Sequence, residues 1–266
     1  VVWQEVRPDA GYDILGQMVT GAGTLSGSRI LVGAWEGDQI RPRVAYGSYA
    51  NDFLVVWEDH HWGEAAGWDI YGQRVATDGS LRGADLTVAD PGTRHATHPD
   101  VAYNPTTRNY LVVWEYAYSA TDHDVFSRRV AYDGTRPDDA VGVSRLGSHE
   151  GAPTVASSGG SSLLVIWEDD RNDAADPDAD LDLYATTQTI SLPTLSGRVY
   201  EGLILDETTP LAGVNVALTC SQSAGDPGTL VDATTTNAEG WYGLPVYGEC
   251  EYYNLQETDP VDYASG

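Results

Sequence analysis

Lysine is absent from this chain of 266 residues, and its cationic side chains are 14 arginines set against 40 acidic residues. The net charge of −26 excludes nucleic acid as a partner, because a phosphate backbone is bound by clustered cationic side chains. The same charge opposes docking on an anionic membrane surface. We therefore expect neither nucleic-acid binding nor membrane insertion.

Long apolar runs and the common catalytic signatures are missing as well. No segment approaches the roughly 18 consecutive apolar residues of a membrane span, and we find no signal-peptide pattern. Because the chain opens on Val1 rather than Met, we expect a processed or partial chain. The sequence has no G-x-S-x-G, H-E-x-x-H, P-loop or dinucleotide-binding pattern. We therefore predict that the protein is not an enzyme and needs no cofactor.

A repeat accounts for most of what the sequence does contain. The strings VVWQE, VVWEDHH, VVWEYAY and VIWEDDR place tryptophan at Trp3, Trp57, Trp114 and Trp167. A segment like DIYGQRV follows each tryptophan, and a segment like VAY precedes three of them. Each unit predicts four short strands in about 55 residues, which is typical of a propeller blade. We expect the four tryptophans to pack between blades.

The fold class predicted is all-β. Residues 1–192 form a β-propeller-like array of about four four-stranded blades, and residues 193–266 form a small β-sandwich. Three units look complete, whereas the first lacks its VAY strand. An incomplete blade exposes an edge strand, here Val1, Val2 and Trp3, that could accept a strand from another copy of the chain.

The second domain carries strings that resemble a known family. PLAGV at 210–214, TTNAEGWY at 235–242 and ETDP at 257–260 resemble the prealbumin-like B-type domain of bacterial surface proteins, the serine-aspartate-repeat, Cna-B and carboxypeptidase-regulatory group. The resemblance implies a β-sandwich used as a stalk or spacer. A lysine-dependent isopeptide bond, found in some members, is excluded because this chain has no lysine.

Two cysteines, Cys220 and Cys250, are the only ones in the chain. They lack neighbouring histidine or cysteine and are poor zinc ligands. A disulfide between them is the favoured interpretation, and two buried free thiols are the alternative. A disulfide indicates an oxidising, extracellular setting. The string VVWEDHHWGEAAGWDIYGQRV also resembles repeats of large secreted bacterial proteins, which implies an extracellular or cell-surface location.

Three groups of side chains are candidate binding sites. The loop RNDAADPDADLD is a candidate Ca²⁺ site, with a solvated acidic loop as the alternative; its acids are Asp173, Asp176, Asp178, Asp180 and Asp182. Trp62 and Trp68, in a polar loop, are candidate glycan contacts.

The third group is defined by the repeat. Acids flank the loop between the second and third strands, and the blade-to-blade loops carry Asp38, His95 and His149. In a propeller these loops emerge on one face, so this face gathers carboxylates and imidazoles that could hold a metal ion. The paired acids are Glu5 and Asp13, Glu58 and Asp69, Glu115 and Asp124, and Glu168 and Asp182.

The function predicted is that of a non-enzymatic extracellular structural subunit of a bacterial surface or fibre assembly. Copies would join head to tail by strand addition at the incomplete blade, giving a homopolymer. The alternative is a secreted lectin-like or adhesin module that binds surface glycans through the acidic loop face.

Overall fold

The computed structural model describes residues 1–8, 11–61, 67–171, 181–190, 194–201, 209–246 and 252–258. These residues form β-strands and turns and contain no helix, which confirms the all-β prediction. Within them, accordingly, there is no helix long and apolar enough to cross a membrane. The chain divides into two compact units, Val1–Ile190 and Ser191–Gly266, close to the predicted boundary at 192/193.

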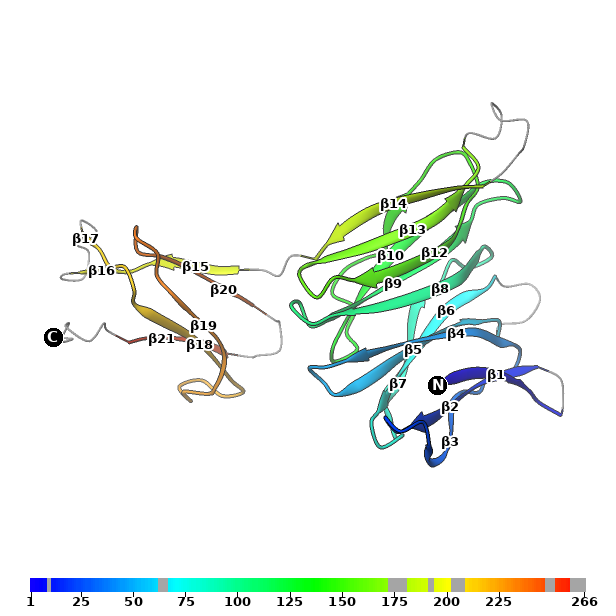
Figure 1. Ribbon diagram of the computed structural model, residues 1–266, viewed down its shortest axis with the longest axis horizontal. Coiled ribbons are helices and arrows are strands. Elements are labelled where there is room, and N and C mark those ends of the chain that lie inside the picture. The colour runs from blue at the N-terminus through cyan, green and yellow to red at the C-terminus, as the bar shows by residue number, and fades with distance from the viewer. Residues whose placement is uncertain are drawn as a thin grey trace. The chain divides into compact units, whose positions relative to one another are not determined.

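The first unit consists of four antiparallel sheets, and each sheet is built from one sequence repeat (Figure 1). We call them blades 1 to 4, in chain order. Blade 1 contains β1 (Val2–Val6), β2 (Tyr12–Val19) and β3 (Leu25–Gly33). Blade 2 contains β4 (Gln39–Gly47), β5 (Asp52–Asp59), β6 (Asp69–Ala76) and β7 (Leu81–Ala89). Blade 3 contains β8 (His95–Asn104), β9 (Asn109–Ala117), β10 (His123–Ala131) and β11 (Val141–Ser144). Blade 4 contains β12 (Glu150–Ser157), β13 (Ser162–Asp169) and β14 (Asp182–Thr189).

The propeller-like array is confirmed, but the predicted strand count is wrong for one blade. Blades 2 and 3 have four strands, and blade 1 lacks its first strand as expected. Blade 4, predicted to be complete, has three strands among the described residues. The reason is that β14 ends at Thr189 and the second unit begins at Ser191, which leaves no room for a fourth strand.

Asp-Gly dipeptides form the hairpin turns that the sequence predicts. Gly79 and Gly134 have φ of 90° and 93°, a conformation that glycine adopts without a steric penalty. The side chains of Asp78 and Asp133 accept the amide of the residue two positions on, at 2.9 and 2.8 Å. The turn is therefore fixed by both residues of the dipeptide.

The hydrophobic core lies between successive blades, and a tryptophan occupies each interface. Trp57 packs with Ile14 and Val32 of blade 1, and Trp114 packs in a cluster that includes Ile70 of blade 2. Trp167 packs in the corresponding cluster of blades 3 and 4. These three side chains are 0%, 1% and 6% exposed, whereas Trp3 is half-buried.

A buried ion pair within blade 2 is hydrogen-bonded to a tyrosine of blade 3. Asp52 is 0% exposed and accepts hydrogen bonds from Arg74 Nη2 at 2.6 Å and from the Tyr110 hydroxyl at 3.1 Å. Arg82 lies 3.7 Å from the same carboxylate but has a side chain 41% exposed. Arg74 is therefore the main group that compensates the buried charge of Asp52.

The second unit contains three small sheets among its described residues. Their strands are β15 (Thr194–Arg198) with β20 (Trp241–Pro245), β16 (Tyr200–Glu201) with β17 (Thr209–Pro210), and β18 (Asn215–Ser221) between β19 (Thr229–Thr235) and β21 (Tyr252–Thr258). A hydrophobic cluster of Val214, Val216, Leu218 and Leu244 forms the core. The resemblance to prealbumin-like domains stays a prediction.

Cys220 lies in β18 and is disulfide-bonded. Its predicted partner, Cys250, lies outside the described residues, and the pairing stays a prediction. We expect a reducing agent to destabilise the second unit by about 3 kcal/mol, because the cross-link restricts the unfolded chain. Hydrogen exchange should then rise between 194 and 258 and stay unchanged in the blades. Equal protection of both units with and without reductant would contradict the pairing.

Candidate metal centre

A hydrogen bond between neighbouring blades recurs at three of the four repeat tryptophans, Trp3, Trp57 and Trp114. The acceptor is the side chain of the residue directly after the tryptophan. The donor is a backbone amide in the first strand of the next blade, from the residue directly before a proline. The bonds are Arg41 N to Gln4 Oε1 at 2.8 Å, His98 N to Glu58 Oε1 at 2.7 Å and Ala152 N to Glu115 Oε2 at 3.1 Å. The donor residues have φ of 53°, 51° and 46° and sit at a bulge in their strands. The side chain after the tryptophan therefore has a structural role as hydrogen-bond acceptor. Glutamine fulfils this role in blade 1, and glutamate fulfils it in blades 2 and 3.

Blade 3 departs from the repeat two residues after its tryptophan. In the other blades an acid at this position accepts the indole N–H, as in Trp57 to Asp59 at 3.0 Å and Trp167 to Asp169 at 3.2 Å. Blade 3 has Tyr116 there, and the Trp114 Nε1 is buried without a hydrogen-bond partner among the described residues. Departures from an otherwise consistent pattern are typical of functional sites. The region around the end of β9 is therefore the candidate functional site.

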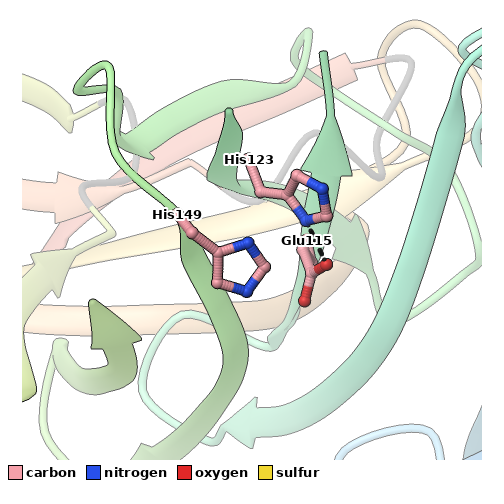
Figure 2. A group of neighbouring side chains, drawn as sticks. All are labelled: Glu115, His123 and His149. Carbon is pink, nitrogen blue, oxygen red and sulfur yellow. Dashed lines mark hydrogen bonds and ion pairs between the residues drawn. The ribbon is translucent and has the colours of Figure 1, made fainter. Parts of the chain in front are cut away.

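Three side chains converge at that place (Figure 2). Glu115 lies near the end of β9, His123 begins β10, and His149 lies directly before β12. His123 Nδ1 is 2.6 Å from Glu115 Oε1, and the rings of His123 and His149 are 4.3 Å apart between centroids. One potential ligand atom from each of the three residues lies within 4.8 Å of the others. A fourth side chain, His98, approaches Glu115 Oε2 with Nδ1 at 3.2 Å.

The electrostatics of the cluster keep Glu115 ionised. Burial alone would raise its pKa, but hydrogen bonds from His98, from the Ala152 amide and from His123 outweigh burial and lower the pKa to about 2. The hydrogen bond to Glu115 also raises the pKa of His98. Glu115 is therefore an anion at neutral pH and carries no proton that it could donate as a general acid.

Hydrogen bonds fix the main chain at His149, and a glycine two residues on leaves room beside its imidazole. The His149 amide donates to Asp170 Oδ1 at 2.7 Å, and its carbonyl accepts the Asp170 amide at 3.2 Å. A Cβ at Gly151 would lie 2.9 Å from both Glu115 Oε2 and His149 Nε2. The repeat-equivalent positions carry Ile40 and Thr97. Glycine therefore occupies this repeat position in blade 4, where a larger side chain would collide with Glu115 and His149.

A pocket of about 550 Å³ opens beside the cluster, lined by Glu115 and His123. Trp68 from the loop before β6 and His95 at the start of β8 also line it, together with Tyr118 from the loop after β9. The Trp68 ring stacks on His60 at 4.8 Å. Aromatic faces, imidazoles and a carboxylate therefore meet in one cavity.

The structure brings together only some of the predicted site residues. His95 and Trp68 line the pocket and His149 joins the cluster, whereas Asp38 accepts the His60 amide with its backbone oxygen at 2.9 Å. Trp62 and the acids Asp173, Asp176, Asp178 and Asp180 lie outside the described residues, so the Ca²⁺ site stays a prediction. Asp182 is exposed at the start of β14.

The predicted edge is present as a structural feature. Among the described residues, β1 pairs with β2 as its one neighbouring strand, and the Val1 amino group and carbonyl each bond to Gln17. Val1 is 71% exposed, while Val2 and Trp3 are half-buried. Association with further copies of the chain and an extracellular location stay predictions.

Two of the four residues around the cluster escaped the sequence analysis. His98 and His123 stand at repeat positions occupied by Arg41 and Trp68 in blade 2, so neither belongs to a shared motif. The signal that could have revealed them is Tyr116, which replaces the acid found two residues after the other tryptophans.

Asp69 belongs to one of the recurrent acid pairs but lies in a different environment. Burial raises the pKa of Asp69 to about 7, and repulsion from Asp90 and Asp59 adds to the rise, while His61 opposes it. Since the unfolded pKa is near 3.8, the folded state loses stability as the pH rises from about 4 to about 7.

We therefore expect Asp69→Asn to stabilise the blades at pH 8 relative to the natural chain, by on the order of 2 kcal/mol. The difference between the two proteins should disappear toward pH 4, where both side chains are neutral. Urea unfolding across this pH range measures it. A difference that does not change with pH would contradict the raised pKa.

Comparisons with known proteins find similarity at the level of fold. No model of a protein family matches the chain, and no curated protein matches it. Similar solved structures include a thermostable family-43 glycoside hydrolase, with 13% identity and a TM-score of 0.46 over 69% of this chain and 65% of that one. An α-L-arabinofuranosidase from Lactobacillus brevis has 13% identity and a TM-score of 0.43, over 77% of this chain and 67% of that one. The GH93 α-L-arabinofuranosidase of Fusarium graminearum has 13% identity and a TM-score of 0.44, over 92% of this chain and 76% of that one.

These neighbours correct the predicted function. They are enzymes that act on carbohydrates, so the prediction of a non-enzymatic structural subunit, with its lectin-like alternative, is wrong, as is the exclusion of enzymatic activity. The physical reason lies in blade 3, where a cluster assembled from separate strands leaves no contiguous motif in the sequence. The likeness itself extends to the fold and assigns no reaction to this chain.

Proposed function

We propose that the protein is a metal-dependent hydrolase whose metal ion is held by Glu115, His123 and His149. The observation that carries the proposal is the convergence of these three donors within 4.8 Å. Two histidines and one glutamate are a frequent ligand set of catalytic zinc, which keeps a further position open for water. A tetrahedral zinc ion with bonds of about 2.1 Å holds its ligand atoms about 3.4 Å apart. Small side-chain rotations would therefore bring the three ligand atoms from their present separations, within 4.8 Å, to bonding distance from one ion.

The remaining groups fit this function better than metal-free glycoside hydrolysis. Glycoside hydrolysis by two carboxyl groups needs one that carries a proton at working pH. Glu115, the one carboxylate among the described residues that line the pocket, has a pKa of about 2 and carries none. A divalent ion instead lowers the pKa of a bound water and yields a nucleophile at neutral pH.

Each residue then has a defined role. Glu115 supplies the negative charge that offsets the ion, and His123 and His149 supply neutral nitrogen ligands. His98 is a positioning residue, because it holds the second oxygen of Glu115 at 3.2 Å. In the reaction, the oxygen of water bonds to the electrophilic carbon of the substrate, the bond to the leaving group breaks, and the proton from water passes to the leaving group.

The test is a titration of the metal-free protein with Co²⁺, followed by absorption spectroscopy, and then hydrolysis of 4-nitrophenyl acetate with and without metal. We expect a one-to-one complex with tetrahedral cobalt bands, and hydrolysis that chelator removes and Zn²⁺ restores. Absence of the complex, or a complex without metal-dependent hydrolysis, would overturn the proposal.

Gly151→Ala provides a steric test of the same site. The added methyl group would meet Glu115 Oε2 and His149 Nε2 at 2.9 Å, so we expect Co²⁺ affinity to fall at least about tenfold. Gly147→Ala, in the loop before β12, is the matched control, because nothing lies within 4 Å of its added Cβ. Equal affinities of the two variants would show that the ion binds elsewhere.

A further inference from the structure

An arginine, Arg94, lines the pocket beside the cluster, and its situation differs from that of most arginines in the chain. At least ten of the 14 arginines lie within 4.0 Å of a carboxylate. Among the described residues no such contact occurs for Arg94, although acids outnumber arginines 40 to 14. The guanidinium instead lies over the Tyr118 ring, 4.8 Å from its centroid.

The position of Arg94 is set by its backbone. The Gly67 amide donates to the Gly92 carbonyl at 2.8 Å, and a Cβ at Gly67 would lie 1.4 Å from the Arg94 carbonyl oxygen. This close approach requires glycine. The loop that carries Arg94 is therefore packed against the start of β6, and the guanidinium is held at the pocket by Tyr118.

The rest of the lining suits a hydroxyl-rich ligand. The Trp68 amide donates to His95 Nδ1 at 3.3 Å, so a neutral His95 ring carries its proton on Nε2 and can donate it to a ligand. Thr93, Thr97 and Ser119 add hydroxyl groups, and Trp68 adds an aromatic face. Few anions would enter a pocket on a protein of charge −26 without a cation that binds them.

We propose that the substrate is an acidic saccharide whose carboxylate or sulfate group binds Arg94. Guanidinium groups bind such oxyanions through paired hydrogen bonds. The inference rests on the proposed function, since it names the substrate class of that same pocket. Binding of the anionic group at Arg94 orients the saccharide against Trp68 with its reacting bond toward Glu115 and His123.

The test compares three probes by calorimetry on the zinc-loaded protein: tetragalacturonate, a heparin-derived tetrasaccharide and neutral galactotetraose. We expect at least one acidic probe to bind tenfold or more tightly than galactotetraose. Arg94→Gln should abolish that preference without changing the affinity for galactotetraose. Arg43→Gln is the matched control, because it removes the same charge from an exposed side chain and should keep the preference.

The outcomes separate this inference from the metal site. Equal or tighter binding of the neutral probe, or an acidic preference that survives Arg94→Gln, would overturn the inference even if Zn²⁺ binds and hydrolysis occurs. An Arg94-dependent preference in a protein that binds no metal would sustain the inference and overturn the proposed hydrolase. Binding of tetragalacturonate would show that a carboxylate suffices, whereas binding of the heparin fragment alone, which carries both kinds of anion, would point to its sulfate groups.

Discussion

Glu115→Gln is expected to weaken binding of Zn²⁺ or Co²⁺ by at least about a hundredfold, since it removes the one anionic ligand of the cluster. Metal-dependent hydrolysis should be lost with it. The metal-free protein should also lose stability at neutral pH, by on the order of 2 kcal/mol, because the neutral carboxamide lacks the charge that His98 and His123 stabilise, although its oxygen can still accept the Ala152 amide. The chain itself uses this arrangement in blade 1, where Gln4 accepts the Arg41 amide. Competition with a chromophoric chelator measures the affinity, and urea unfolding measures the stability.

Glu58→Gln is the matched control for this variant. Glu58 occupies the same repeat position, is 1% exposed and accepts the His98 amide, but it pairs with Arg41, and Trp68 stands at the repeat position of His123. The control should keep its metal affinity while losing the ion pair to Arg41. If both variants bind metal as the natural chain does, Glu115 is only the structural acceptor that its repeat position requires.

Arg74→Met is expected to destabilise the blades by about 3 to 5 kcal/mol, since it leaves the fully buried Asp52 without its main cationic partner. For a unit of this size the melting temperature should fall by about 10 °C. Arg82 is too solvent-exposed to take over, and the Tyr110 hydroxyl carries no charge. Calorimetry of the intact chain measures the shift.

The double variant Asp52→Asn with Arg74→Met completes the cycle. Removing both charges should recover most of the lost stability, because the cost arises from an uncompensated buried charge rather than from the missing contact. The carboxamide oxygen that replaces the carboxylate can still accept the Tyr110 hydroxyl. A double variant as unstable as Arg74→Met alone would contradict this account and point to lost packing.

The repeat made most of the fold predictable. The spacing of Trp57, Trp114 and Trp167 placed one blade per unit, and Asp-Gly pairs such as Asp78-Gly79 marked hairpins, since these signals depend on local geometry alone. The absence of a fourth strand among the described residues of blade 4 was harder to foresee, because it depends on where the chain leaves the repeat after Ile190.

The site was only partly predictable, for a physical reason. Its residues come from three strands of blade 3 and from the loop before β12 of blade 4, and an isolated bridge between His123 and His149 joins the two blades there. His149 and Glu115 could be assigned to one face from blade topology, since both stand at fixed repeat positions. The roles of His123 and Gly151 depend on their distances to Glu115 and His149. These distances exist only in the folded chain, so the sequence could not predict the two roles.

The central claim is that Glu115, His123 and His149 bind one divalent transition-metal ion. X-ray diffraction from zinc-soaked crystals, measured on both sides of the zinc absorption edge, tests it most directly. The account predicts one strong anomalous peak at bonding distance from Glu115, His123 Nδ1 and His149. A map without a peak between these three residues, at a zinc concentration that populates other sites, would contradict it.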